Sequence, residues 1–586
     1  MCGFVLHISK NKISESVFRN SLLSINHRGP DNLAIKKLND FFYIGHVRLS
    51  IIDLSSKSNQ PFHNDKENKF LIFNGEIYNH HSLRKKLENN KIRFNTNGDT
   101  EVLYKILEFE KLDSIKDLNG MWSFIFINSE TNELILSRDR YGKKPLYYYK
   151  DNKDFIVASE IKAIFEILNK TRKLRNDFLE YYISTGNWNN ESKKTFYTNI
   201  YQLTPGEIKI IFYKDYKFKE ESININNLEE FENKSFGDYN EIIKDSINIR
   251  LDCDVPKSIF ISGGIDSSLI ASLSLDKKKE IHWITGSTGY GNDLKYSKEL
   301  AKNLKIDLDI IEIPYDLNSI KIIDEMTKMY EIPIPLIGNS IAMNFLYKKI
   351  SEKGIRVVVD GTGGDEVFGG YFDYYYRNVI NELINENKYN KLLKYLISSK
   401  NLHKQSIILF IKHIIRNKIL KKLYKNKNNL EKNKNLYSLK EFQKYDCKFG
   451  RLQTWLRMND TNSMMYSIET RSPLLDYRLF SFIEKNIDYK FKNGFNKYYL
   501  RSIMPNTVSD NIRWRIDKQG FRWSFEKFYN DNEDYIINNI KKIDYTSNYY
   551  NKLNLNNNKK NENILMILRL FSVSKVFEKL NCITDI

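Results

Sequence analysis

Cysteine is scarce in this chain, and the spacing of the few cysteines argues against two classes of protein. The 586 residues contain four of them, Cys2, Cys253, Cys447 and Cys582. They form no CxxC pair and show no metal-ligand spacing, so neither a disulfide framework nor a cysteine-ligated metal centre is expected. Widely separated thiols are typical of a reducing compartment, and we expect a cytoplasmic location.

Long apolar runs are missing as well. The first run, Phe4 to Ile8, is too short for a signal peptide, and no cleavage site follows it. The densest later run, residues 407–411, is interrupted at Lys412 and His413. Neither approaches the roughly 18 apolar residues of a membrane-spanning helix. We therefore expect a soluble protein without a membrane partner.

Acidic residues are outnumbered, since 92 lysines and arginines face 73 aspartates and glutamates, for a net charge of +19. Such an excess can indicate a nucleic-acid or membrane-surface partner. The lysines are dispersed, however, and largely lack interleaved arginine and glycine. We interpret the charge as a compositional bias and expect no nucleic-acid partner. The length is enough for two to four domains with a large core.

The first 210 residues or so are rich in short β-type runs, and residues from about 240 onward alternate between strand and helix. The alternation is typical of a parallel, doubly wound sheet. A polar stretch at 224–235 is the expected linker, and the Lys- and Asn-rich residues 380–440 are expected to form a variable helical segment. In the first part, strands are predicted at 41–45, 70–73, 123–127, 133–137, 146–149 and 155–158, and helices at 82–89 and 100–110. In the second, strands are predicted at 258–261, 281–285, 308–313 and 356–359, and helices from 266 and at 294–304, 320–330 and 340–352.

Cys2 is a candidate nucleophile. Removal of Met1 would leave a thiol and a free α-amine on one residue. The amine has a reference pKa of roughly 7.7–8, so it can act as the base that generates the thiolate, and no histidine is required. An acyl transfer also needs an oxyanion hole, which Asn74 and Gly75 can supply on a turn after a strand.

Two glycine-rich turns each follow a predicted strand. In the first, residues 262–268, glycines allow close approach, and hydroxyls and N–H groups can cradle pyrophosphate at a helix N-terminus. The GK[ST] ending of a Walker loop is absent. The second turn covers residues 360–371. Asp266 in the first and Asp365 in the second are candidate Mg²⁺ ligands.

The N-terminal pattern resembles the class II glutamine amidotransferases, which are N-terminal-nucleophile hydrolases with a four-layer αββα fold. The resemblance rests on Cys2 together with residues 28–31, 48–51, 74–79 and 97–99. It implies Cys2 as the nucleophile, a cation for the glutamine α-carboxylate and carboxylates for its α-ammonium. The implied residues are Arg48 for the carboxylate, Glu76 and Asp99 for the ammonium, and Asn74 with Gly75 for the oxyanion.

The C-terminal turns resemble those of ATP pyrophosphatases, and the whole chain resembles the glutamine-hydrolysing asparagine synthetase family. Residues 469–476 look like that family's run near the synthetase site, and Lys497 looks like its pyrophosphate-gripping lysine. The resemblance implies a glutamine amidotransferase domain over 1–215 and an ATP-pyrophosphatase domain over 236–586. The implied ATP and pyrophosphate site comprises Ile261, Ser262, Gly263, Gly264, Asp266, Ser267, Ser268, Thr285, Asp360, Gly361 and Lys497.

The implied reaction uses glutamine, ATP, Mg²⁺ and a carboxylate acceptor, and the resemblance is compatible with a homodimer. Glutamine is hydrolysed at Cys2, ammonia passes through the interior, and an AMP-activated carboxylate is amidated, by default aspartate to asparagine. Two differences from the family pattern leave the identity of the acceptor undecided. Thr362 stands where the family often has an acidic residue that takes a proton from ammonium. Residues 335–340 lack most of the hydroxyl and charged side chains expected for reading aspartate.

Three interpretations therefore remain. The first is an asparagine synthetase. The second is a related amidotransferase acting on another carboxylate, such as a uronic acid destined for surface polysaccharide. The third is a non-enzymatic binding module driven by the basic charge, against which Cys2 and Asp266 argue.

Overall fold

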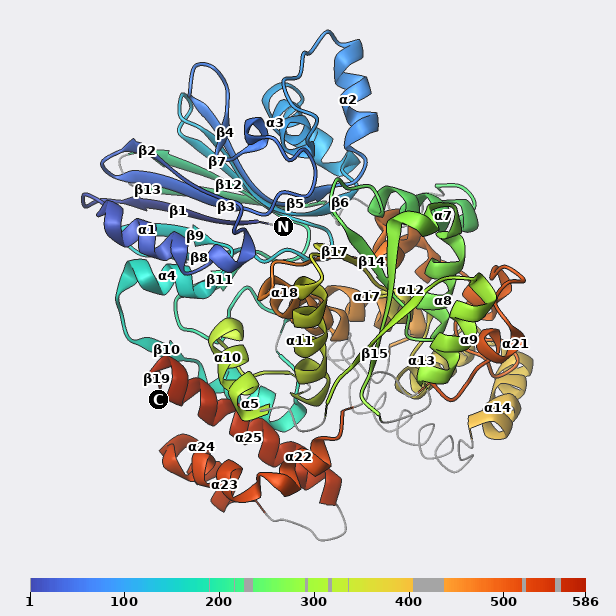
Figure 1. The fold of residues 1–586 in the computed structure, drawn as a ribbon. Coiled ribbons are helices and arrows are strands. Elements are labelled where there is room, and N and C mark those ends of the chain that lie inside the picture. Colours follow the sequence, from blue (N-terminus) through green and yellow to red (C-terminus); the bar gives the residue numbers. More distant parts are fainter. Residues whose placement is uncertain are drawn as a thin grey trace.

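The computed structural model describes residues 2–585, except 189, 215–216, 226–235, 290–292, 315–318, 336, 404–436, 519–522 and 554–559. The chain has an antiparallel half followed by a parallel half, with the two packed against each other (Figure 1). Most of the predicted linker and of the predicted variable segment lies outside the described residues. No helix among the described residues is long and apolar enough to cross a membrane.

Two stacked six-stranded sheets form the antiparallel half. The first sheet is ordered β11 (Ile200–Gln202), β8 (Tyr147–Lys150), β9 (Asp154–Ala158), β1 (Gly3–Ser9), β3 (Phe42–Arg48) and β2 (Asn32–Asn39). The second is ordered β13 (Lys217–Asn224), β12 (Glu207–Lys214), β7 (Glu133–Arg138), β6 (Gly120–Asn128), β5 (Lys69–Ile77) and β4 (Phe62–His63). The second sheet thus extends past residue 215 through β13.

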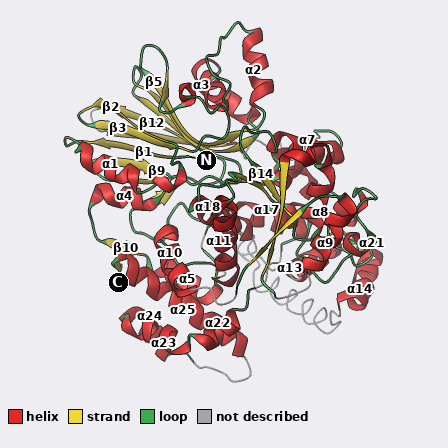
Figure 2. Ribbon diagram, viewed as in Figure 1, coloured by secondary structure: helices red, strands yellow, loops and turns green. Residues whose placement is uncertain are grey.

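Helices cover the outer faces of both sheets (Figure 2). On the first sheet lie α1 (Glu15–Leu23) and α4 (Ile161–Leu168), and on the second lie α2 (His80–Asn89) and α3 (Asp99–Phe109). Strand β1 is buried throughout because both of its faces are covered: Phe4 and Leu6 pack between the sheets, whereas Val5 packs under the helices. The predicted αββα fold is confirmed.

A five-stranded parallel sheet organises the second half, in the order β16 (Leu308–Glu312), β15 (Ile281–Ser287), β14 (Lys257–Phe260), β17 (Val357–Val359) and β18 (Glu469–Arg471). The two faces of this sheet pack into different hydrophobic clusters. Val358 on one face belongs to the first cluster, and Val359 on the other face belongs to the second. Helices α7 (Tyr239–Arg250), α8 (Ile265–Leu273) and α9 (Asp293–Leu304) pack with the second cluster, and α10 (Ser319–Tyr330) and α11 (Ile337–Glu352) with the first. The doubly wound prediction is confirmed.

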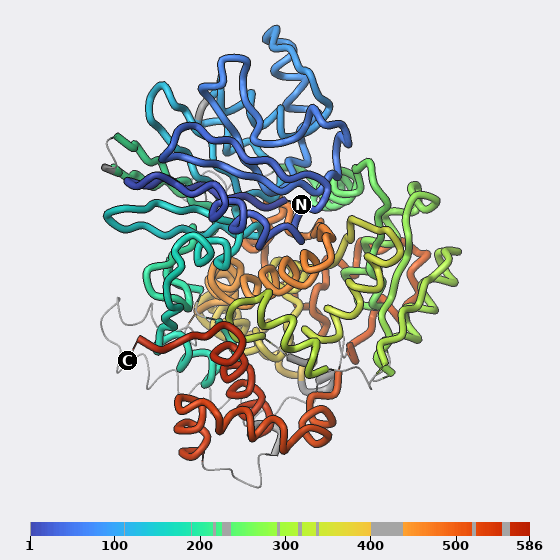
Figure 3. The backbone as a smooth tube through the Cα atoms, turned by 60° about the vertical axis from the view of Figure 1, so that its left-hand side comes forward, coloured from blue at the N-terminus to red at the C-terminus, as the bar shows by residue number. Residues whose placement is uncertain are grey.

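The last 120 residues or so complete the sheet and then return to the first half. Strand β18 was not predicted, because three residues of mixed polarity carry no strand pattern. After the C-terminal helices, including α25 (Lys560–Leu580), β19 (Cys582–Thr584) pairs with β10 (Arg172–Leu174). Figure 3 shows this red C-terminal end returning toward the N-terminal half.

Around the parallel sheet lie further helices. They are α12 (Gly364–Phe368), α13 (Phe372–Asn385), α14 (Tyr389–His403), α17 (Leu439–Lys448), α18 (Arg451–Met464), α19 (Ile487–Lys490), α20 (Tyr498–Ser502) and α21 (Asp510–Arg513). In the C-terminal part, α5 (Asn176–Thr185) packs on α25 beside α22 (Phe525–Asp531), α23 (Glu533–Lys542) and α24 (Asp544–Asn551). Of these, α18 matters most for function, because it reaches both halves.

Candidate active sites

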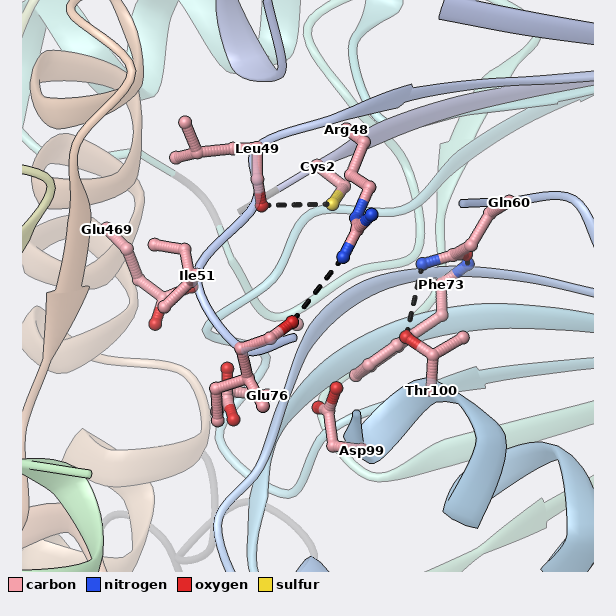
Figure 4. Close-up of a pocket in the computed structure, with 12 residues that line it drawn as sticks. Cys2, Arg48, Leu49, Ile51, Gln60, Phe73, Glu76, Asp99, Thr100 and Glu469 are labelled. Atoms are coloured by element: carbon pink, nitrogen blue, oxygen red, sulfur yellow. Dashed lines mark hydrogen bonds between the residues drawn. The ribbon is translucent and has the colours of Figure 1, made fainter. Parts of the chain in front are cut away.

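Cys2 directly precedes β1 and is one of the residues that line a pocket (Figure 4). Its thiol faces the carbonyl oxygen of Leu49 at 4.0 Å, and its backbone nitrogen donates to Asn74 Oδ1 at 3.2 Å. Burial raises the pKa of the thiol, while the Leu49 contact and the Arg48 charge act in the opposite direction. A thiol in this position needs a nearby base to become a nucleophile.

The pocket gathers most of the predicted glutamine-binding residues. Its lining is Cys2, Arg48, Leu49, Ile51, Ile52, Gln60, Phe73, Gly75, Glu76, Asp99, Thr100 and Glu469. Asn74 does not line it but contacts Cys2 directly. Residues from β3, β5 and α3 therefore line one pocket together with Cys2.

Backbone geometry explains why position 75 is a glycine. A Cβ there would lie 2.1 Å from the carbonyl oxygen of Met121 on the neighbouring strand, which no side chain tolerates. The adjacent Asn74 is completely buried, and its Nδ2 donates to Ser123 Oγ at 3.5 Å. These contacts fix both candidate oxyanion groups beside Cys2.

The cation and the carboxylates of the pocket are held by different means. The guanidinium of Arg48 donates to the carbonyl of Ser55 and to Asn59 Oδ1, each at 2.8 Å. Asp99 accepts from the backbone N–H of Ile77 at 2.9 Å, and burial raises its pKa to about 6. The pKa of Glu76 is raised by burial and by the neighbouring charge of Asp99. A bound ammonium group would offset both effects.

Glu76 also connects the two halves of the chain. Its Oε2 accepts from Arg471 at 3.2 Å, and Arg471 in turn pairs with Glu469 at 2.7 Å. All three side chains are almost completely buried. Glu469 itself lines the Cys2 pocket, so β18 of the second half forms one wall of the site in the first. The sequence alone gave no sign of this contact.

The first glycine-rich turn joins β14 to α8 as predicted. Gly263 has φ +65°, and a Cβ there would lie 2.7 Å from Tyr296 Cβ. The hydroxyls of Ser262 and Ser267 are 3.0 Å apart, and Ser268 Oγ is buried without a hydrogen-bond partner among the described residues. A hydroxyl without a partner in the first turn of a helix, as at Ser268, suits a phosphate ligand.

The other predicted residues of this turn are tied together by Ser297, from α9. Its hydroxyl donates to the Ile261 carbonyl at 3.0 Å and accepts from Thr285 Oγ1 at 3.5 Å. Ile261, directly after β14, and Thr285, within β15, are therefore linked through Ser297.

Both glycine-rich turns meet at Asp266. A Cβ on Gly361 would lie 2.6 Å from Asp266 Cβ, and a Cβ on Gly364 would lie 2.6 Å from Asp266 Oδ1. Lys497 lies between the two acidic residues, with its ammonium nitrogen 2.5 Å from Asp266 and 2.6 Å from Asp365. Burial opposes ionisation of Asp365, but the charge of Lys497 keeps the pKa of that carboxyl below its usual value.

These carboxylates fit a magnesium ion. Asp266 Oδ1 is buried and has no hydrogen-bond partner among the described residues. The described residues hold no group of three or more His, Cys, Asp or Glu side chains suited to a metal. Mg²⁺ typically takes one or two protein carboxylates and completes its shell with phosphate oxygens and water, so Asp266 and Asp365 would be enough.

Thr362 lies in a hydrogen-bonded corner of the second turn. Its backbone N–H donates to Asp360 Oδ1 at 3.0 Å, and its hydroxyl accepts from Asn459 Nδ2 at 3.0 Å. Asn459, on α18, also donates to Asp360 Oδ2 at 3.2 Å. Of the predicted acceptor segment, Ser340 is buried and its hydroxyl donates to the Pro335 carbonyl at 2.5 Å, whereas residue 336 lies outside the described residues.

Two cations near the first turn were not predicted. Arg515 donates to the Gly263 carbonyl at 3.2 Å, and its guanidinium lies 3.8 Å from the centre of the Tyr296 ring. A Cβ on Gly264 would lie 3.1 Å from Lys518 Cε. The signal that could have revealed them is the cluster of Arg513, Arg515 and Lys518 downstream of Lys497.

Comparisons with known proteins match both halves of the chain. A family model described as "Glutamine amidotransferase domain" matches residues 1–221, and one described as "Asparagine synthase" matches residues 238–545. A putative asparagine synthetase (glutamine-hydrolyzing) 2 of Methanocaldococcus jannaschii is 31% identical over 64% of this chain and 76% of its own length. Asparagine synthetase (glutamine-hydrolyzing) 1 of Bacillus subtilis is 29% identical over 94% of this chain and 92% of its own length. Amidase chry2 of Gibberella zeae is 28% identical over 60% of this chain and 54% of its own length.

Proposed function

The chain belongs to the asparagine synthase family. We propose that it hydrolyses glutamine at Cys2 and uses ATP to amidate a carboxylate, and that this carboxylate is aspartate. One observation carries the proposal. Glu469 lines the Cys2 pocket, and two residues further along the same strand the Arg471 carbonyl accepts from the Asp360 N–H at 2.9 Å. A single strand therefore touches both the thiol pocket and the second glycine-rich turn.

Glutamine hydrolysis would begin when Met1 is removed and the nitrogen of Cys2 becomes a free amine. That amine takes the thiol proton, and the sulfur attacks the carboxamide carbon of glutamine. As the C–N bond breaks, the amine returns the proton to the departing ammonia. Asn74 and Gly75 stabilise the oxyanion, and water then releases glutamate from the thioester.

Substrate recognition in this pocket would rely on charge. Arg48 would bind the α-carboxylate of glutamine, and Glu76 with Asp99 would bind its α-ammonium. Both carboxylates have raised pKa values in the free pocket, so the ammonium would add a charge partner to Asp99 and a second one, besides Arg471, to Glu76. The match favours a free amino acid over a side-chain amide within a peptide.

Acceptor activation would take place between the two glycine-rich turns. The acceptor carboxylate attacks the α-phosphorus of ATP, and the bond to pyrophosphate breaks. The turn at 262–268 would hold the phosphates through N–H groups and hydroxyls, while Lys497 would neutralise the departing pyrophosphate. Mg²⁺, held by Asp266 and Asp365, would supply further positive charge at the phosphates.

Ammonia would then travel from Cys2 along β18 to the second turn and displace AMP. The halves meet here in a buried polar interface, where Asp460 of α18 accepts from Arg28 at 3.0 Å and pairs with Lys144 at 3.3 Å. These partners belong to the antiparallel half. These ion pairs would keep the two sites in a fixed relative position while ammonia passes between them.

A second candidate function is amidation of another carboxylate, such as a uronic acid. It is favoured by Thr362, whose hydroxyl is a poor base, and by the scarcity of charged side chains over residues 335–340. Relatives of this chain also include proteins named as amidases, in Gibberella zeae and Penicillium rubens, and not only proteins named as asparagine synthetases.

The two candidates are separated by ATP–pyrophosphate exchange measured against aspartate, glucuronate, galacturonate and their nucleotide conjugates. Exchange with aspartate alone would support the first candidate, and exchange with the sugar acids alone would support the second. No exchange with any carboxylate, in protein that still hydrolyses glutamine, would contradict the proposed synthetase reaction.

A further inference from the structure

Lys143 reaches from the antiparallel half into the parallel half. It belongs to the turn after β7, where Asp139 Oδ1 accepts the backbone N–H groups of Tyr141 at 3.1 Å and Lys143 at 3.0 Å. These bonds fix the turn, and the Lys143 side chain is 7% exposed. Its ammonium nitrogen lies 2.8 Å from the hydroxyl oxygen of Ser472, directly after β18.

From Lys143 a continuous hydrogen-bonded chain leads to the second glycine-rich turn. Ser472 Oγ donates to Asp360 Oδ1 at 2.7 Å, and the same carboxylate oxygen accepts from the Thr362 N–H at 3.0 Å. Ser472 is 2% exposed and Asp360 is 8% exposed. The chain is therefore shielded from bulk water, and its far end lies at the position where the acceptor is expected to react.

The neighbouring Lys144 provides a contrast. Lys144 forms an ion pair with Asp460 at 3.3 Å, whereas Lys143 forms no ion pair among the described residues. Four charged groups act on Lys143: Asp360 and Glu469 favour its charged form, and Lys144 and Arg250 oppose it. Burial is the strongest influence, and together these groups lower the pKa of Lys143 to about 7. A neutral amine is thus available near neutral pH.

Amide formation needs a proton acceptor. When ammonia attacks the acyl-adenylate, a C–N bond forms, the C–O bond to AMP breaks, and the electron pair leaves on the phosphate oxygen. The nitrogen must then lose one proton. The Thr362 hydroxyl is a poor base, and the hydroxyl also accepts a bond from Asn459.

We propose that Lys143 is the proton acceptor of the ammonia step and is reached through Asp360 and Ser472. The proton passes from nitrogen to Asp360, Asp360 gives one to the Ser472 oxygen, and the Ser472 hydroxyl gives its own to the Lys143 amine. Lys143 ends as an ammonium and returns its proton to water after the products leave. The inference rests on the proposed amidotransferase function and identifies the group that completes it.

Two substitutions separate this role from a structural one. Lys143→Met removes the amine and keeps most of the side-chain stem, whereas Lys143→Arg keeps a positive charge that does not titrate near neutral pH. Lys150→Met, at a surface lysine paired with Glu220, is the matched control. Ammonia-dependent amide formation is measured across pH beside ATP–pyrophosphate exchange and glutaminase activity, with the acceptor that supports exchange in the wild type.

For both Lys143 variants we expect amide formation to fall by about 10²–10⁴-fold, the usual contribution of a general base. Exchange and glutaminase activity should stay at the wild-type level. At a fixed concentration of free NH₃, the wild-type rate of amide formation should rise with pH through about 7, and the variants should lose this rise. Thr362→Glu in the Lys143→Met background should restore much of the rate.

Contrary results are equally specific. Wild-type amide formation with an unchanged pH profile in Lys143→Arg would overturn the inference. Parallel loss of exchange and amide formation in both variants would show that Lys143 only holds the interface. Absence of exchange in the wild type would instead contradict the proposed function itself.

Discussion

The guanidinium of Arg471 donates to Glu76 at 3.2 Å, although the two residues lie in different halves of the chain. Glu76 belongs to the glutamine pocket, and Arg471 precedes the Ser472 contact with the second turn. An ion pair that is buried at both ends thus joins the two candidate sites.

Removing Arg471 should destabilise the protein strongly. Arg471→Met would leave the carboxylates of Glu76 and Glu469 buried without their cation, a change that typically costs about 3–5 kcal/mol. Urea unfolding followed by circular dichroism measures the loss. Arg478→Met, at a partly exposed arginine, is the control. Equal stability of the Arg471→Met variant and the wild type would contradict the ion-pair account.

Cys2→Ala should abolish glutamine-dependent synthesis and leave ammonia-dependent synthesis intact. The substitution removes the nucleophile, but the ATP site lies in the other half of the chain. Both activities are measured on the same preparation. Equal loss of both in folded protein would disprove the two-site account. Mass spectrometry of active protein that still carries Met1 would exclude the amine as the base.

Asp266→Asn or Asp365→Asn should eliminate Mg²⁺-dependent AMP formation and spare glutaminase activity. Each change removes one carboxylate from the pair that faces Lys497, and with it one expected metal ligand. AMP release is measured in a magnesium titration. Near-normal synthesis in either variant would show that the metal binds elsewhere.

The KM for glutamine should rise as pH falls through about 6. The pKa of Asp99 is raised to about 6, so its carboxylate is ionised above that pH and protonated below it. Only the ionised form binds an ammonium group. The pH effect should appear in the KM for glutamine. The KM for ATP in the ammonia-dependent reaction, which does not use the glutamine pocket, is the control. A glutamine KM that stays constant through this range would argue against the assigned role.

The rate of amide formation with a given acceptor should depend on the residue at position 362. If aspartate binds, Thr362→Glu should raise aspartate-dependent synthesis, because it places a carboxylate beside Asn459. If aspartate does not bind, the same substitution should have no effect on it. Efficient aspartate turnover by the wild type, with no activity on any uronic acid, would exclude a uronic acid as the acceptor.

Much of the fold could be predicted from local pattern. Strand β14, turn 262–268 and α8 follow one another as expected, because apolar runs and glycines record strand burial and close approach. Strand β18 could not be predicted, because its three residues show no apolar pattern and it is identified only by its pairing with β17.

The site residues could be predicted where each one lies in a recognisable motif, and could not be predicted where a residue outside any motif makes the contact. Asp266, Asp365 and Lys497 come together as the motifs suggest. By contrast, the contact of Lys143 with Ser472 spans 329 positions in sequence, and no local pattern encodes it. Such contacts depend on how the two halves dock, which only the folded chain reveals.

The most direct test of the central claim follows the nitrogen atom. Wild-type protein is given ATP, the acceptor that supports exchange, glutamine labelled with ¹⁵N in its side-chain amide, and an excess of unlabelled ammonium. Mass spectrometry then reads the isotope in the amide product. Transfer between two connected sites predicts a product that carries mainly ¹⁵N. A product that carries the unlabelled nitrogen of the solution would contradict it.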